Sequence, residues 1–335
     1  MPAAPRRSER RPPRFPPPQF PAHKPKLFAT TPPAIFSPIL GLLGLVLALR
    51  QAAVILGFGA GGAEVAAGAV LALWVWAVVA IKVKGWRRLS VLLEDMRPLP
   101  GRGGLAAASM SGMAAGAVIA PYAPLVALVL LWGALFAHAV LLGLLAASLL
   151  RQPAEARSVN PTLHMSVVGF IVAAPALTRL GWTASATAIF WPCLVAAVQI
   201  WAASLVDLAR HVPPAPLRPL LAIHVAPAAV LSSAAMALEM DGLGTGLAAL
   251  AVLIAVGLLA AGRWMVPAGF SPMWGAFTFP LAALANGLLA QGGAGVQAGL
   301  VVTAAALVAV PWIAWKVLKL WPGGRLAQKT GAAEA

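Results

Sequence analysis

Histidines are the side chains with which this chain could most readily hold a metal or a haem, and they are scattered. Only His138, His164 and His224 can lie within apolar segments, one in each segment. Haem-binding bundles need facing histidine pairs and zinc sites need clustered ligands, so we predict neither a metal nor another cofactor. His164 and His224 follow Pro161 and Pro219 by three and five residues. They could face a cytoplasmic vestibule and attract anions, or pack near the membrane interface.

Carboxylates also stay out of the apolar segments. Glu64, Asp207, Glu239 and Asp241 come nearest, and each falls at the end of a segment. Aspartyl chemistry within a membrane and metal-dependent prenyl transfer both need a pair of carboxylates at depth, and coupled transporters usually carry ionisable groups there. The sequence therefore predicts a protein that is not an enzyme, and it favours passive conduction over coupled transport.

The elements that must position these residues are membrane spans. Of the 335 residues, 61% are hydrophobic and 10% are charged, and the mean hydropathy is +0.87. A soluble chain has about 25% charged residues. The apolar runs show no strand-like alternation, and only helices or closed barrels satisfy the backbone in lipid, so we predict an all-α integral membrane protein. The ten expected spans are 33–49, 65–83, 104–120, 124–150, 160–177, 182–206, 219–238, 243–262, 273–290 and 296–317.

The placement of the basic residues predicts the topology. If the amino terminus is cytoplasmic, 22 of the 24 Lys and Arg residues lie in the tails and loops on that side. Only Arg50 and Arg179 fall outside. Because cytoplasmic loops are enriched in Lys and Arg, we predict an even number of spans in the cell inner (plasma) membrane, with both termini in the cytoplasm.

The same composition divides the chain into three parts. Residues 1–30 are basic and rich in proline, which predicts a disordered cytoplasmic tail that rests on the anionic membrane surface rather than on nucleic acid. Residues 31–320 form the expected membrane domain. Residues 321–335 are expected to form a short cytoplasmic tail.

Prolines recur inside alternate spans and indicate a repeat. Pro175, Pro227 and Pro280 are 52 and 53 residues apart, so the repeating unit is a helical hairpin, and ten spans make five tandem hairpins. In the third span Gly112 and Gly116 take the place of the proline. A proline inside a helix frees a carbonyl, which in lipid must be buried or wetted, so we predict an inner ring of bent helices that lines a cavity. The alternative is that Pro and Gly are simply commoner in membrane helices.

Short motifs resemble a known family. The stretch FSPMWGAFTFP, from Phe270 to Pro280, resembles the F-S-x-x-W-x-x-[YF]-T-F-P segment of the tellurite-resistance/C4-dicarboxylate transporter (TehA-like) family, which includes the plant slow-type anion channels. The stretch from Leu217 to Pro227 is similar to the family's L-R-x-x-x-x-I-x-x-A-P, and Ser90 to Glu94 is similar to its S-V-L-x-E. The similarity covers nearly the whole chain beyond the basic tail.

This resemblance implies five hairpins around a central pore in each subunit of a homotrimer. It also implies that a phenylalanine of the ninth span, here Phe279, blocks the pore midway, with Phe277 and Thr278 as its neighbours. The implied function is passive conduction of small anions such as chloride or nitrate. The alternative is a secondary, proton-coupled exporter of tellurite, sulfite or C4-dicarboxylates. A membrane enzyme would need a buried catalytic pair, which the sequence lacks.

The residues that give anion preference are harder to predict. Carbonyls freed at the proline kinks present negative dipoles, which have the wrong sign to attract an anion. We expect no fixed basic residue in the inner spans, so the cytoplasmic basic cluster would have to concentrate anions at one mouth. We expect membrane lipid to surround the protein as its other partner.

Overall fold

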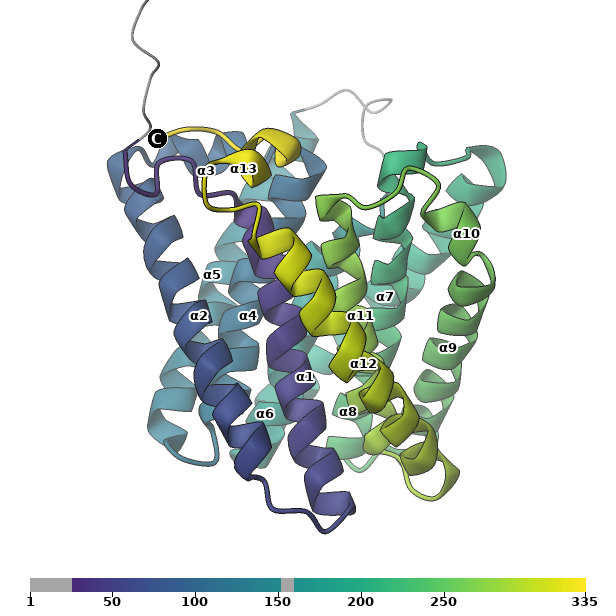
Figure 1. Ribbon diagram of the computed structural model, residues 1–335. Helices are drawn as coiled ribbons and strands as arrows, with labels where there is room; N and C mark the ends of the chain where they lie inside the picture. Colours follow the sequence, from purple (N-terminus) through teal and green to yellow (C-terminus); the bar gives the residue numbers. More distant parts are fainter. Residues whose placement is uncertain (1–25, 152–159) are drawn as a thin grey trace, which may run out of the picture.

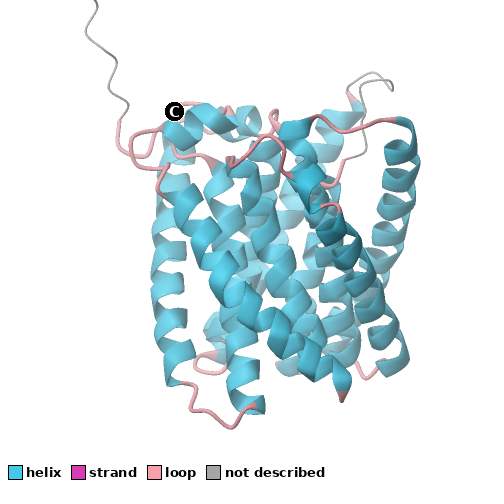
Figure 2. Cartoon of the chain, turned by 45° about the vertical axis from the view of Figure 1, so that its right-hand side comes forward, coloured by secondary structure: helices cyan, strands magenta, loops and turns pink. Residues whose placement is uncertain are grey.

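Helices make up all the regular structure in the residues that can be described. The computed structural model describes residues 26–151 and 160–335, and no strand forms within them, as Figure 2 shows. The predicted class, an all-α membrane protein, is confirmed. Most of the predicted basic tail lies in residues 1–25, which are outside the described ranges. Arg157 is also outside the described ranges.

Ten helical segments follow one another in the described ranges and form five hairpins (Figure 1). The first members are η1 (Pro33–Ile35) with α1 (Phe36–Ile55); α4 (Leu99–Ile119); η3 (His164–Val168) with η4 (Gly169–Ala173) and α6 (Ala174–Arg179); η5 (Ala215–His224) with α8 (Val225–Ala237); and η6 (Pro272–Phe277) with α11 (Thr278–Leu289). The second members are α2 (Gly61–Arg87), α5 (Pro124–Leu150), α7 (Thr183–Arg210), α9 (Asp241–Ala260) and α12 (Ala294–Leu318). Three short helices, α3 (Ser90–Asp95), α10 (Gly262–Met265) and α13 (Arg325–Thr330), lie at one end.

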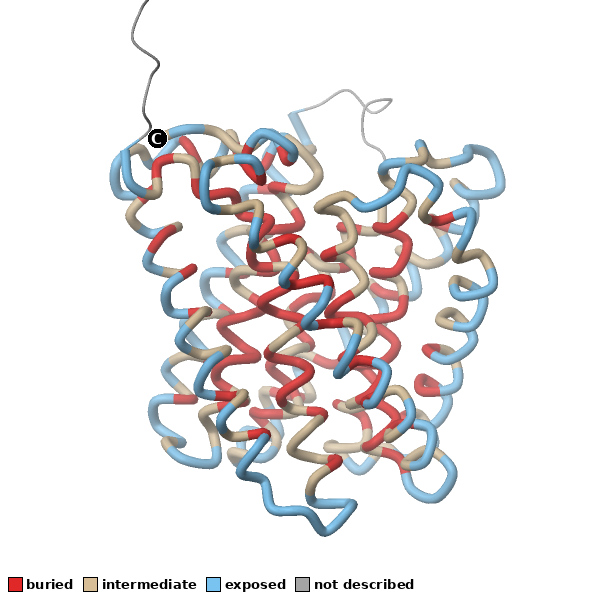
Figure 3. Tube along the Cα trace, in the orientation of Figure 1, coloured by how far each residue is buried: buried red, intermediate tan, exposed pale blue. Residues whose placement is uncertain are grey.

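The first members of the hairpins form an inner ring and the second members an outer ring. Seven segments in the described ranges are long and apolar enough to cross a membrane, and these include all five second members. The two inner segments among them are well buried: 56% of the most apolar stretch of Pro33–Ile55 and 83% of that of Ala215–Ala237 lie inside the bundle. In the second members the buried share of the most apolar stretch is only 22% to 33%. Figure 3 shows the buried residues gathered along the middle of the bundle. The exposed apolar side chains of the outer ring therefore face lipid.

Three inner segments change helix type at the proline expected to bend them. The chain first forms 3₁₀ or π turns (η3 and η4, η5, or η6), and an α-helix begins one or two residues before the proline. Pro175, Pro227 and Pro280 lie in the first turns of α6, α8 and α11. A first-turn proline costs little, because its missing N–H would have had no helical partner. The expected bend within one helix is therefore a joint between two unlike helices.

Gly112, the expected kink of the third span, lies in an uninterrupted α-helix. A Cβ built on Gly112 would lie 3.0 Å from the Cβ of Ala134, so the glycine lets α4 approach α5. Glycine also brings α1 against α11: a Cβ on Gly41 would lie only 2.4 Å from the Cβ of Thr278. Helices this close leave no room for a side chain, so these glycines set the spacing of the rings.

Both described ends of the chain meet at one end of the bundle (Figure 1). The backbone N–H of Ala335 donates to the carbonyl of Ala29 at 3.0 Å. The segment expected as a short tail forms α13, whose Leu326 is fully buried in the main apolar core. Because both ends lie on one side, the number of segments between them is even.

Most basic residues in the described ranges lie at this end, which we call the basic end. It holds Lys84, Arg102, Arg151 and Lys319, for example, at or near helix ends. Arg50 and Arg179 lie near the other end, which we call the opposite end.

Candidate pore and gate

A cavity opens at the basic end and reaches into the middle of the bundle. Every inner segment contributes to its wall, and the wall is mostly apolar. Leu40 of α1, Met110 of α4, Ile171 of η4, Val230 of α8 and Phe279 of α11 are examples. The cavity thus follows the axis of the inner ring.

A second cavity enters the same ring from the opposite end. Its wall also takes residues from all five inner segments, including Gly44, Ala114, Arg179, Ser233 and Asn286. Unlike the first cavity, it carries a cationic side chain and two side-chain amides, and Ser233 adds a hydroxyl group. No carboxylate among the described residues lines either cavity.

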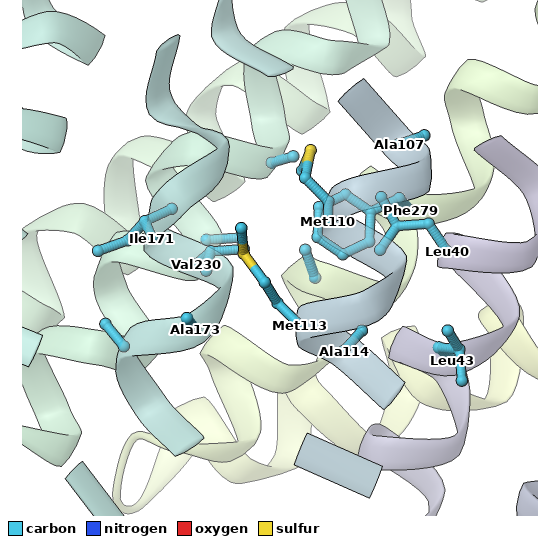
Figure 4. Close-up of a cluster of buried hydrophobic side chains, with 14 of the residues drawn as sticks. Leu40, Leu43, Ala107, Met110, Met113, Ala114, Ile171, Ala173, Val230 and Phe279 are labelled. Carbon is cyan, nitrogen blue, oxygen red and sulfur yellow. The ribbon is translucent and has the colours of Figure 1, made fainter. Parts of the chain in front are cut away.

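Phe279 lies between the two cavities and lines both, together with Val172 and Val230. Its side chain is 9% exposed. Figure 4 shows it among buried side chains of the other inner segments, with Leu40 and Met110 labelled next to it. One apolar layer, centred on this ring, therefore separates the two openings.

The backbone next to Phe279 is tied to α1. The hydroxyl of the fully buried Thr278 donates to the carbonyls of Gly275, at 2.7 Å, and Ser37, at 3.2 Å. Phe277 packs on the cluster of Leu221, Ala222 and Met265 and edge-on against Trp274, with ring centroids 5.7 Å apart. The two neighbours expected from the motif thus hold the base of the Phe279 joint.

His164 and His224 form a pair at the wall of the basic-end cavity. His164 lines the cavity, and its Nε2 lies 3.0 Å from Nδ1 of His224, at hydrogen-bond distance. Trp201 of the outer helix α7 covers the pair: its indole N–H donates to the carbonyl of His224 at 3.2 Å. One imidazole must donate and the other accept, so the pair holds at most one extra proton while this bond lasts.

The polar groups of the opposite-end cavity are partly organised among themselves. The amide of Asn286 donates to the carbonyls of Gly44 and Ala282 at 2.8 Å and accepts from Gln51 at 3.2 Å. Arg179, exposed at the end of α6, has no carboxylate partner among the described residues. Its guanidinium is a free positive charge at the cavity wall.

Arg179 corrects the expectation that no basic residue of an inner segment faces the pore. The sequence predicted only that Arg179 lies on the non-cytoplasmic side, beyond the end of its span. One signal could have revealed it: Arg179 and Arg50 are the two basic residues on the side that the positive-inside rule disfavours. Arg50 is neutralised by Glu64, with N–O distances of 2.6 and 2.8 Å, and Arg179 is not.

Comparison with known families agrees with this geometry. Residues 30–320 match the family model described as SLAC1, voltage-dependent anion channel. The chain belongs to this family. The match spans all ten helical segments, and the resemblance of the ninth-span motif is confirmed at the level of the family. No curated protein matched the chain.

Membership gives the coarse function of the protein. The family comprises anion channels and transporters, which are multi-pass membrane proteins, and small anions are its substrates. The candidate pore must therefore be judged as a path for anions across the bundle.

Proposed function

We propose that this protein is a channel for small anions, with a central pore closed by the side chain of Phe279. One observation carries the proposal: two cavities enter the inner ring from opposite ends, and Phe279 lies between them. The ring is bulky and apolar, so it excludes hydrated ions while it stays in place. The protein is not expected to be an enzyme, and we expect it to need no cofactor.

The pore wall suits an anion better than a cation. Its described residues include no carboxylate, and Arg179 provides a positive charge at the opposite end. The side-chain amide of Gln51 adds a donor at the wall of the same cavity. Basic residues at the other end raise the local concentration of anions. Chloride and nitrate are small enough to pass, and tellurite, sulfite and dicarboxylates are candidates.

Opening requires the Phe279 ring to leave the axis. Phe279 is the second residue of α11, directly after the change from 3₁₀ to α geometry and directly before Pro280. At such a joint the backbone can turn without breaking a regular ladder of hydrogen bonds. We propose that movement of η6 against α1 carries the ring aside.

Current through planar bilayers tests the proposal. The native chain, Phe279→Ala and Phe136→Ala are compared under a chloride gradient. Phe136 is 72% exposed on the outer helix α5, so its substitution removes a phenylalanine outside the pore. We expect a large ohmic chloride current from Phe279→Ala and near silence from the other two. A silent Phe279→Ala protein that is folded would contradict the gate.

A coupled exporter is the second candidate, and the histidine pair favours it. His164 and His224 supply an exchangeable proton beside the basic-end cavity. An exporter would show saturable, pH-dependent uptake into vesicles, and His164→Gln would abolish its dependence on a proton gradient. A flux that rises linearly with chloride concentration and does not depend on the proton gradient would exclude the exporter and support the channel.

Orientation and assembly belong to the same proposal. We propose that the basic end is cytoplasmic in the cell inner membrane, because its Lys and Arg residues obey the positive-inside rule. The homotrimer implied by the resemblance stays a prediction.

A further inference from the structure

A separate pocket lies at the basic end, outside the pore. It is formed by the end of α12, the start of η6 and the short helix α13. Its empty volume is about 560 Å³. The lining residues are Phe270, Pro272, Lys316, Lys319, Leu320 and Lys329. Half of this wall is lysine and the rest is apolar.

The three lysines bring positive charge without compensation. No carboxylate among the described residues forms an ion pair with Lys316, Lys319 or Lys329. Elsewhere at this end the acids are already engaged: Asp95 pairs with Lys84, and Glu94 with Arg88. Three unpaired ammonium groups around one pocket repel each other, and an anion between them relieves that repulsion.

Lys316 is held in place by aromatic rings. Its Nζ lies 4.1 Å from the ring centroid of Trp312 and 5.3 Å from that of Phe270. Cation–π contacts of this kind hold the ammonium group and leave its N–H bonds free to donate. The pocket therefore has one preset donor, with Lys319 and Lys329 beside it.

The pocket lies where a bilayer would change from chains to headgroups. It adjoins α12, an outer helix whose Trp312 and Trp315 are 45% and 69% exposed. Exposed tryptophans next to lysines at a helix end are typical of the membrane–water interface. An ammonium cluster at this depth meets phosphates of lipids, and the apolar Phe270 and Leu320 suit the glycerol and first methylenes.

We propose that this pocket binds the phosphate headgroup of an anionic phospholipid in the adjacent leaflet. The proposal does not depend on the gate, and orientation decides only which leaflet supplies the lipid. Pro272 lines both this pocket and the basic-end cavity, so the bound headgroup lies beside the first residue of η6. A free phosphate offers the same oxyanion chemistry, and the experiment separates the two sources.

Native mass spectrometry of the full chain measures the binding. The protein is released from nanodiscs of phosphatidylcholine that contain a minor fraction of phosphatidylglycerol, and the retained lipid is counted. The pocket variant is Lys316→Gln, Lys319→Gln and Lys329→Gln combined. The control variant, Arg151→Gln, Arg210→Gln and Arg263→Gln, removes equal charge from exposed positions of the same end outside the pocket.

We expect the native and control chains to retain phosphatidylglycerol equally, and the pocket variant to bind it about tenfold more weakly or worse. Replacing the three lysines by arginine restores binding, which separates loss of charge from loss of folding. Equal retention by the pocket variant overturns the proposal, and so does equal weakening of the control. Inorganic phosphate that displaces the lipid at low concentration overturns the lipid as the ligand.

Discussion

Arg50 and Arg179 differ in what surrounds their guanidinium groups, although both lie near the opposite end. Arg50 donates to both carboxylate oxygens of Glu64 and to the carbonyl of Val118, so its charge is neutralised and it stabilises the fold. Arg179 lines the cavity without a carboxylate partner among the described residues. An unpaired charge on a pore wall acts on passing ions, because it shifts the potential at the mouth.

Arg179→Gln in the Phe279→Ala background is expected to lower chloride conductance by about threefold at low salt, and less at high salt because ions screen the charge. Selectivity for chloride over potassium should fall with it, measured as the reversal potential under a potassium chloride gradient. Arg210→Gln, exposed at the basic end and outside both cavities, is the matched control. Unchanged conductance and reversal potential would exclude Arg179 from selectivity.

At this scale the sequence predicted some residues and missed others for a physical reason. The gate role of Phe279 stays a prediction from its specific motif, and its position between the cavities supports that role. The role of Arg179 depends on which way α6 turns its last residue, which no local pattern encodes. The contact of His164 with His224 joins residues 60 apart and needs the packed bundle.

The joints in three inner segments support the proposed movement of the gate. In each of them the α-helix begins one or two residues before the proline, and it is preceded by 3₁₀ or π turns whose hydrogen bonds are weaker than those of an α-helix. Next to the third joint, Gly41 lets α1 approach Thr278, the first residue of α11, closely. In the proposed mechanism we expect the gate to move at the joint between η6 and α11, where Phe279 lies.

Gly41→Ala tests this tight contact. The new methyl would lie 2.4 Å from Thr278, so one helix must shift, and we expect a loss of about 1–3 kcal/mol of stability. Gly133→Ala is the matched control, because a Cβ there meets nothing within 4 Å, and helix propensity alone should stabilise it by up to about 1 kcal/mol. Unfolding in detergent, followed by circular dichroism, measures both. Equal midpoints would disprove the close contact.

The elements themselves were largely predictable. The ten apolar runs correspond to the ten segments, and the proline period identified the hairpins, because hydrophobicity and proline act locally. The 3₁₀ and π turns were not predicted, because their geometry is set by packing against neighbouring helices. Gly112 shows the same limit: the residue type suggested a kink, but it serves close packing in a regular helix.

At the scale of the whole molecule, a buried ion pair connects distant parts of the chain. Lys84 and Asp95 are fully buried and 2.6 Å apart. Lys84 also donates to the carbonyl of Thr31, and Asp95 accepts from the N–H of Ala333. Four segments of the basic end therefore depend on one pair of charges.

Asp95→Asn is expected to cost about 3–5 kcal/mol of stability, because it leaves the Lys84 ammonium buried without a counter-charge. Glu94→Gln, which breaks the partly exposed pair with Arg88, should cost far less, because solvent screens that pair. Thermal unfolding of the purified variants compares them. If both variants lose the same amount of stability, the buried pair does not hold the four segments together as we describe.

Topology was predictable because charge distribution acts on the whole chain: the two described ends meet on one side, as an even count requires. The docking of α13 and the Lys84–Asp95 pair could not be predicted, because both depend on contacts between distant segments.

A single apolar layer between two cavities also decides where a membrane voltage is felt. Solvent in each cavity carries the potential of its own side inward, so nearly the whole voltage falls across the Phe279 layer. A unit charge that crosses this layer gains about 2.3 kcal/mol per 100 mV, wherever it started. The described residues that line both cavities, Val172, Val230 and Phe279, carry no charge. In the proposed pore the voltage therefore acts on the permeating anion and not on the Phe279 ring, and we expect current through the open pore to follow Ohm's law.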